Sequence, residues 1–322
     1  MDHTRLGSTG LRIPHLALGC MSVGDSSRGG HPWVLDEDAA APLFTQALEL
    51  GMTFWDTANS YNLGSSEEIV GRAVRRYTRR EDVVLATKLC LPVGDGPGGS
   101  GLSRRAVMEQ VDASLTRLGT DYVDLYQIHR FDPLTPVEET MEALHDVVKA
   151  GKVRYLGASS MWTWQLAKLQ TAALLGGWTP FVTMQDQYSL LMREEEREMF
   201  GYLADTGMGS LPWSPLARGR VTRPWGQQTA RSSSDLFEGV VDPASDEGTV
   251  NAVEKVAAER GVPMAQVALA WVLRNPVVDA PIVGATKPHH LTDAVAALGL
   301  DLSDDEVTLL EASYTPRLPT GF

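Results

Sequence analysis

Short apolar segments alternate with helical patterns along the whole chain, and this alternation limits the folds available to it. The segments predicted as strands comprise residues 16–19, 53–55, 83–87, 123–128, 153–157, 181–184, 208–211 and 280–283. Between them apolar residues recur at helical spacing, as at Ala40, Leu43 and Ala47. Strict alternation implies parallel strands joined by right-handed crossovers. Eight such units predict an α/β fold, a single-domain (β/α)8 TIM barrel over residues 1–322, with an N-terminal β-hairpin at residues 4–13 and extra helices.

An open doubly wound sheet is the competing topology. Such a sheet usually carries G-x-G-x-x-G after its first strand, whereas Gly19 and Gly24 have the wrong spacing for that signature. Among the local signals, Thr135, Pro136 and Glu138 predict the N-cap, N1 and N3 positions of a capping box. Residues 194–196 predict the start of a helix. The polar stretch 218–248 is long enough to be a functional loop, and a helix is expected at residues 249–260.

Charge and cysteine content narrow the class of partner. The chain has 28 basic and 41 acidic residues and a net charge of −13, which disfavours nucleic acid or an anionic membrane as the main partner. Two cysteines, Cys20 and Cys90, cannot form a disulfide framework and suit a reducing compartment. No apolar run is long enough for a signal peptide core or a membrane helix. We therefore expect a cytoplasmic protein.

Four polar side chains stand just past the ends of predicted strands. Asp56 and Tyr61 follow one strand, Lys88 the next and His129 a third. In a parallel barrel these ends face the same side, where catalytic groups collect. A lysine beside a tyrosine favours the phenolate and is expected to lower the tyrosine pKa from about 10. We expect Asp56 to hold Lys88 charged, and His129 to donate a hydrogen bond to a carbonyl oxygen.

Six segments that include these residues resemble the aldo-keto reductase family. They are residues 55–61 (WDTANSY), 86–88 (ATK), 125–129 (LYQIH), 152–160 (KVRYLGASS), 211–219 (LPWSPLARG) and 282–287 (IVGATK). The resemblance covers essentially the whole chain, in order. It implies a (β/α)8 barrel that reduces a small-molecule carbonyl with NADPH and without a metal. It also implies that Asp56, Tyr61, Lys88 and His129 are the catalytic residues, with Tyr61 as the general acid.

The resemblance also implies a set of cofactor contacts. Ser159 and Gln185 are expected to bind the nicotinamide carboxamide, and Trp213 to stack on its ring. The remaining expected contacts are Ser214, Leu216, Arg218 and Gly219 at the pyrophosphate, Gly284, Thr286 and Lys287 at the adenosine phosphate, His290 and Asp293 at the adenine, and Gly19, Cys20, Met21 and Asp56. Two positions depart from the family pattern, because Ser160 and Ala294 stand where asparagine is usual. A cation at Lys287 beside a helix start favours NADPH over NADH.

Other functions remain open at the level of sequence. One is a nucleotide-binding, redox-sensing regulatory subunit resembling the potassium-channel β subunits, and another is a barrel hydrolase or isomerase that uses Asp56 and His129. The aromatic residues that could form an apolar substrate wall are Trp33, Trp55, Phe131, Trp162 and Trp225. The sequence singles out neither one carbonyl substrate nor an oligomeric state.

Overall fold

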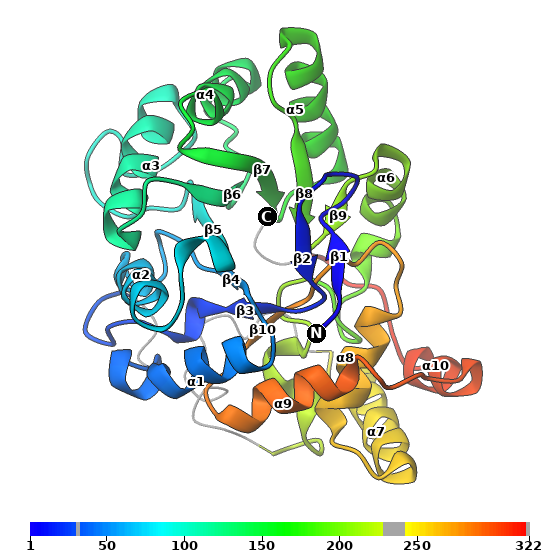
Figure 1. The fold of residues 1–322 in the computed structure, drawn as a ribbon. Coiled ribbons are helices and arrows are strands. Elements are labelled where there is room, and N and C mark those ends of the chain that lie inside the picture. Colours follow the sequence, from blue (N-terminus) through cyan, green and yellow to red (C-terminus); the bar gives the residue numbers. More distant parts are fainter. Residues whose placement is uncertain (30–32, 228–241, 320–322) are drawn as a thin grey trace.

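One parallel sheet of eight strands forms the centre of the molecule (Figure 1). The computed structural model describes residues 1–29, 33–227 and 242–319. Neighbouring strands follow the order β10-β3-β4-β5-β6-β7-β8-β9. Their bounds are β3 Ala17–Gly19, β4 Phe54–Asp56, β5 Val84–Leu89, β6 Val123–Ile128, β7 Val153–Ser159, β8 Phe181–Gln185, β9 Gly209–Ser210 and β10 Ile282–Gly284.

The two outer strands of this order meet and close the barrel. Parallel bridges join Ser210 to Val278 and Trp213 to Ile282. The Ile282 N–H also donates a hydrogen bond to the Pro212 carbonyl at 2.8 Å. The predicted TIM barrel is therefore confirmed.

Helices surround this sheet in the described parts of the chain (Figure 1). The α-helices are α1 Glu37–Glu49, α2 Ser65–Tyr77, α3 Arg104–Leu118, α4 Val137–Lys149, α5 Thr163–Gly176, α6 Met199–Thr206, α7 Pro243–Arg260, α8 Met264–Leu273, α9 Pro288–Ala297 and α10 Asp304–Glu311. Short 3-10 helices span Cys20–Ser22, Arg80–Asp82, Glu194–Glu196 and Ala217–Thr222. Within residues 1–29, 33–227 and 242–319, no helix combines the length and apolar character needed to cross a membrane.

The N-terminal hairpin covers the amino end of the barrel. Its strands are β1 His3–Arg5 and β2 Arg12–Pro14, paired antiparallel as predicted. Leu6 and Ile13 are fully buried in a cluster with inward-facing strand residues such as Phe54 and Leu125. The Ser8 N–H donates to the Gly207 carbonyl at 2.8 Å, and the Gly7 N–H to Asp279 Oδ2 at 2.7 Å. Apolar burial and hydrogen bonds thus fix the hairpin across this end.

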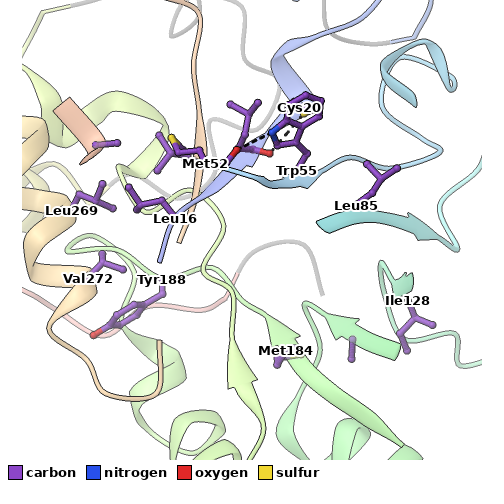
Figure 2. Close-up of a cluster of buried hydrophobic side chains, with 14 of the residues drawn as sticks. Leu16, Cys20, Met52, Trp55, Leu85, Ile128, Met184, Tyr188, Leu269 and Val272 are labelled. Carbon is purple, nitrogen blue, oxygen red and sulfur yellow. Dashed lines mark hydrogen bonds between the residues drawn. The ribbon is translucent and has the colours of Figure 1, made fainter. Parts of the chain in front are cut away.

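A second, larger apolar cluster fills the layer between the sheet and the helices (Figure 2). Trp55 belongs to it and is fully buried. Its ring centroid lies 5.0 Å from that of Phe44. Its indole N–H donates to the Met52 carbonyl at 2.9 Å, and Figure 2 shows these two residues side by side. The expectation that Trp55 could line a substrate pocket is therefore wrong, because strand alternation turns its side chain away from the barrel interior.

Three local expectations also need correction. Thr135 caps no helix, because its hydroxyl donates to Asp132 Oδ2 at 2.7 Å and α4 begins after Pro136 without a side-chain cap. Residues 194–196 form a 3-10 turn, and the α-helix begins only at Met199. Helix α7 begins at Pro243, since Asp242 provides the N-cap. Residues 228–241 of the expected functional loop lie outside the described residues.

Candidate active site

Strand register stacks an apolar layer and a polar layer inside the barrel. Alternate residues of a strand face the same side, so Phe54 and Asp56 share one face, as do Ala86 and Lys88. In the parallel pairing Asp56 lies opposite Ala86, and Lys88 lies opposite Gln127. Phe54 and Ala86 belong to the apolar cluster at the amino end of the barrel, which also contains Leu6 and Ile13. The polar groups therefore gather at the carboxyl ends of the strands, as predicted.

Lys88 is the centre of the polar layer. Its Nζ donates to Asp56 Oδ2 at 2.5 Å, to the Thr57 carbonyl at 2.9 Å and to Tyr61 Oη at 3.0 Å. Lys88 and Asp56 are both buried, with 0% and 2% of their side chains exposed. Burial acts to lower the Lys88 pKa, but Asp56 and Tyr61 outweigh it, so the net shift is upward. Lys88 is therefore a cation at neutral pH.

Tyr61 stands on the turn that leaves β4. The turn is held by a hydrogen bond from the Tyr61 N–H to the Ala58 carbonyl at 3.2 Å, and by left-handed backbone at Asn62 and Leu63. Burial raises the pKa of Tyr61 above 10, although Lys88 acts in the opposite direction. The expected net lowering is therefore wrong, because withdrawing a phenolate from water costs more than one paired cation returns. The phenol is protonated at neutral pH.

His129 faces Tyr61 from the end of β6. The ring centroids are 5.8 Å apart and the planes meet at 78°. Burial lowers the pKa of His129 well below 6.5, and the charges of Lys88 and Arg130 lower it further. No described residue forms a hydrogen bond with the buried Nδ1. The structure thus brings Asp56, Tyr61, Lys88 and His129 together, with a neutral imidazole beside a protonated phenol.

Two glutamines hold the second oxygen of Asp56. Gln127 Nε2 donates to Asp56 Oδ1 at 2.9 Å, and Gln185 Nε2 donates to the same oxygen at 3.0 Å. Gln185 Nε2 also reaches Gln127 Oε1 at 3.1 Å. No role was predicted for Gln127, although alternation along β6 places it on the same face as Leu125 and His129. The side-chain nitrogen of Gln185 is therefore used within the protein. The side-chain oxygen, Oε1, is the group left for a ligand.

Residues expected at the nicotinamide lie on the next strands around the barrel. Ser159, at the end of β7, donates through Oγ to the Gln185 carbonyl at 3.0 Å. The Trp213 indole N–H donates to Ser160 Oγ at 3.0 Å. Ser160, which departs from the family pattern, thus orients the indole of Trp213.

The loop that follows Trp213 has an unusual backbone. Ser214, Ala217 and Arg218 all adopt positive φ, at 51°, 47° and 56°. The guanidinium carbon of Arg218 lies 6.0 Å from the centroid of the Trp213 ring. Left-handed residues in a short loop can turn successive N–H groups toward one concave side, an arrangement suited to anions.

A second expected cofactor segment leaves the barrel beside this loop, because Trp213 pairs with Ile282 of β10. Lys287 is exposed and occupies the N-cap of α9 without a side-chain cap. His290 Nδ1 accepts from the Thr286 N–H at 3.3 Å, while Asp293 accepts from Gln266 at 3.1 Å. The positive end of α9 therefore lies next to a lysine, although Pro288 has no N–H and the His290 N–H donates to the Lys287 carbonyl at 3.1 Å.

The residues after β3 are placed less favourably for ligand contacts. Cys20 is fully buried, and its Sγ lies 3.7 Å from the Leu18 carbonyl. Burial raises the pKa of its thiol strongly. Gly19 lies so close to Ile282 that a Cβ would come within 2.8 Å of Cγ2. Among these residues only Met21 is partly exposed.

Known proteins resemble this chain over nearly its whole length. A model of the aldo/keto reductase family matches residues 15–315. The chain is 45% identical to an aldo-keto reductase of Fusarium vanettenii, over 98% of this chain and 92% of the relative. It is 42% identical to versiconal hemiacetal acetate reductase of Aspergillus parasiticus, over 98% of each. It is 41% identical to a putative aryl-alcohol dehydrogenase of Schizosaccharomyces pombe, over 97% of this chain and 95% of the relative. The chain is an oxidoreductase and belongs to the aldo/keto reductase family.

Proposed function

We propose that this protein reduces an aldehyde or ketone to an alcohol with NADPH, and that Tyr61 is the general acid. The observation that carries the proposal is the buried Lys88 ammonium, which bridges Asp56 at 2.5 Å and Tyr61 at 3.0 Å. The relatives named as a reductase and as a putative aryl-alcohol dehydrogenase support carbonyl chemistry.

In this reaction the proton comes from a side chain of the protein. When bound, the reduced nicotinamide supplies a hydride to the carbonyl carbon. Tyr61 donates its proton to the carbonyl oxygen, and Lys88 stabilises the phenolate that remains. Asp56 keeps Lys88 charged and in place. The neutral His129 ring carries one N–H with which to hold the oxygen near the phenol.

The hydrogen-bond donors and the lysine at the carboxyl end of the barrel suit the phosphate groups of a dinucleotide. Trp213 would cover the nicotinamide ring. Ser159 and the side-chain carbonyl oxygen of Gln185 would contact the carboxamide group of the nicotinamide. The loop of residues 214–219, with its positive-φ backbone, would hold the pyrophosphate. Lys287 and the N-terminus of α9 would hold the 2′-phosphate.

The Tyr61→Phe variant tests the chemistry. It should lower kcat for aldehyde reduction by about 10²- to 10⁴-fold, because the proton donor is lost while the ring remains. Loss of NADPH absorbance with a panel of aldehydes gives the rate. Quenching of tryptophan fluorescence by NADPH gives nucleotide binding, which should stay unchanged. A wild-type protein that binds NADPH tightly but turns over no carbonyl would favour the regulatory function instead.

The Lys287→Met variant tests the choice of nucleotide. Removing the cation should weaken NADPH binding about tenfold or more and leave NADH binding nearly unchanged, since a charge-assisted phosphate contact is lost. The ratio of kcat/KM for the two nucleotides measures this preference. An unchanged ratio would contradict the role of Lys287.

A further inference from the structure

Arg130 is a cation beside the proposed catalytic groups for which the structure shows no anionic partner. It follows His129 directly and is partly buried. Its Nη1 donates to the His129 carbonyl at 2.5 Å. No other hydrogen bond or ion pair joins its guanidinium to any residue in 1–29, 33–227 or 242–319. This bond uses one of the five guanidinium N–H groups, and the described residues provide no acceptor for the other four.

The groups around Arg130 do not balance its charge. The titratable groups that interact with it are Tyr61, Cys90 and His129. All three are neutral near pH 7, because burial raises the pKa of Tyr61 above 10 and that of Cys90 to about 11, and lowers the pKa of His129 well below 6.5. The nearby carboxylate of Asp132 is already used within its own loop, where it accepts from the Leu102 N–H at 2.8 Å. It also accepts from the Leu134 N–H at 2.9 Å and from the Thr135 hydroxyl at 2.7 Å.

Two other partly buried arginines have a carboxylate partner, whereas Arg223, like Arg130, donates to a backbone carbonyl. Arg80 pairs with Asp124 at 2.6 Å, and Arg117 pairs with Glu67 at 2.6 Å. Withdrawing a guanidinium from water without an anion costs free energy, so the pairing of these two is the expected arrangement. Among Arg80, Arg117 and Arg130, the last is the exception, and it is the one beside Tyr61.

We propose that Arg130 is a specificity-determining residue that receives a carboxylate of the substrate. The guanidinium fork matches a carboxylate in a bidentate hydrogen bond. The aromatic pair next to it suits an aryl body, because the ring centroids of Phe131 and Trp164 lie 6.0 Å apart and 58% of Trp164 is exposed. The favoured substrate is thus an aryl aldehyde or ketone that bears a carboxylate. This inference rests on the carbonyl reductase function proposed above.

Kinetics with matched aldehydes test the inference. The probes are 2-, 3- and 4-carboxybenzaldehyde, each compared with its methyl ester, and unsubstituted benzaldehyde. For at least one isomer, the wild-type kcat/KM for the acid should exceed that for the ester about tenfold to a hundredfold, mainly through KM. Arg130→Met should abolish this preference, so that the ratio of kcat/KM for acid and ester falls to about one. Arg130→Lys should restore part of it, because it keeps the charge but not the fork.

A control variant separates local charge from net charge. Arg105→Met removes one positive charge from an exposed position on α3, where Arg105 pairs with Glu109. The preference for the acid should persist in this variant. A wild-type enzyme that reduces benzaldehyde and the esters as well as every acid would overturn the inference while leaving the proposed function standing. So would an acid preference that survives in Arg130→Met.

Binding without turnover gives an independent measurement. In Tyr61→Phe saturated with NADP+, calorimetry should detect binding of at least one of 2-, 3- and 4-hydroxymethylbenzoate, and the Tyr61→Phe, Arg130→Met double variant should bind that isomer about tenfold or more weakly. Equal binding by the two proteins would overturn the role of Arg130. If no aldehyde is reduced but this difference is found, then carbonyl reduction fails and the anion site stands.

Discussion

At the scale of single residues, the candidate active site depends on one buried ion pair. Asp56 receives Lys88 on one oxygen and two glutamine amides on the other. Removing one member of a buried pair leaves an uncompensated charge and is usually much worse than replacing both. The pair therefore holds the phenol contact in place, and the glutamines fix the carboxylate that orients Lys88.

The pKa shifts predict a flat pH profile. His129 has its pKa well below 6.5, and Tyr61 has its pKa above 10. Between about pH 7 and pH 9 neither group changes its protonation state, so kcat/KM for carbonyl reduction should be nearly constant there. Initial rates from about pH 6 to about pH 9, at constant ionic strength, check the prediction. An inflection near pH 6.5 to 7 that disappears in His129→Asn would contradict the assignment of a neutral imidazole.

The four candidate catalytic side chains could be predicted from the sequence because each stands at or soon after the carboxyl end of a predicted strand, although Asp56 and Lys88 belong to β4 and β5 themselves. The role of Gln127 could not be predicted, because its contact with Asp56 depends on which residues of two non-adjacent strands share the barrel interior. The direction of the Tyr61 pKa shift was also predicted wrongly. A cation can be read from the sequence as a neighbour, whereas the depth of burial that outweighs it appears only in the folded structure.

At the scale of elements, close packing of α2 on α3 requires Gly71. A Cβ at this position would come within 2.2 Å of the Leu118 carbonyl oxygen. Gly71→Ala should therefore destabilise the protein by about 1–3 kcal/mol, even though alanine favours a helix. Urea unfolding monitored by circular dichroism measures the change.

Gly201 in α6 provides the matched control. It is exposed, and a Cβ there would meet no atom within 4 Å. Gly201→Ala should raise the free energy of unfolding by about 0.5–1 kcal/mol, because it lowers the entropy of the unfolded chain and favours the helix. Equal effects at the two positions would show that the contact with Leu118 does not matter.

The start of a helix can be predicted from the sequence where the capping side chain has one local partner. It is harder to predict where a second partner competes for the same side chain. Ser103 stands directly before α3 and caps it, with Oγ accepting from the Ala106 N–H. Thr135 also has the sequence pattern of an N-cap, but the Thr135 hydroxyl donates to Asp132 Oδ2 and does not cap α4. The alternation that predicted the barrel is more robust, since it is repeated eight times and does not depend on any one hydrogen bond.

At the scale of the whole molecule, buried carboxyl groups should make stability depend on pH. Burial and the charge of Glu194 raise the pKa of Glu195 from 4.5 to about 8, and burial raises the pKa of Asp186 as well. The unfolded chain ionises these groups at lower pH than the folded protein does. Stability should therefore fall as the pH rises from about 4.5 to about 8.

Glu195→Gln should reduce this fall. The melting temperature at about pH 8 should rise relative to that of the wild type, while the two proteins should be similar near pH 5, where Glu195 is protonated in the folded state. Glu254→Gln, at an exposed position of α7, controls for the lost charge. The same change in melting temperature for both variants would mean that burial of Glu195 has no part in the effect.

The hairpin at the amino end has a consequence for the order of events. Because β1 and β2 lie across that end, the dinucleotide and the carbonyl compound of the proposed reaction would both enter at the opposite rim. If the nicotinamide lies deeper than the molecule it reduces, the dinucleotide would arrive before the carbonyl compound and leave after the alcohol.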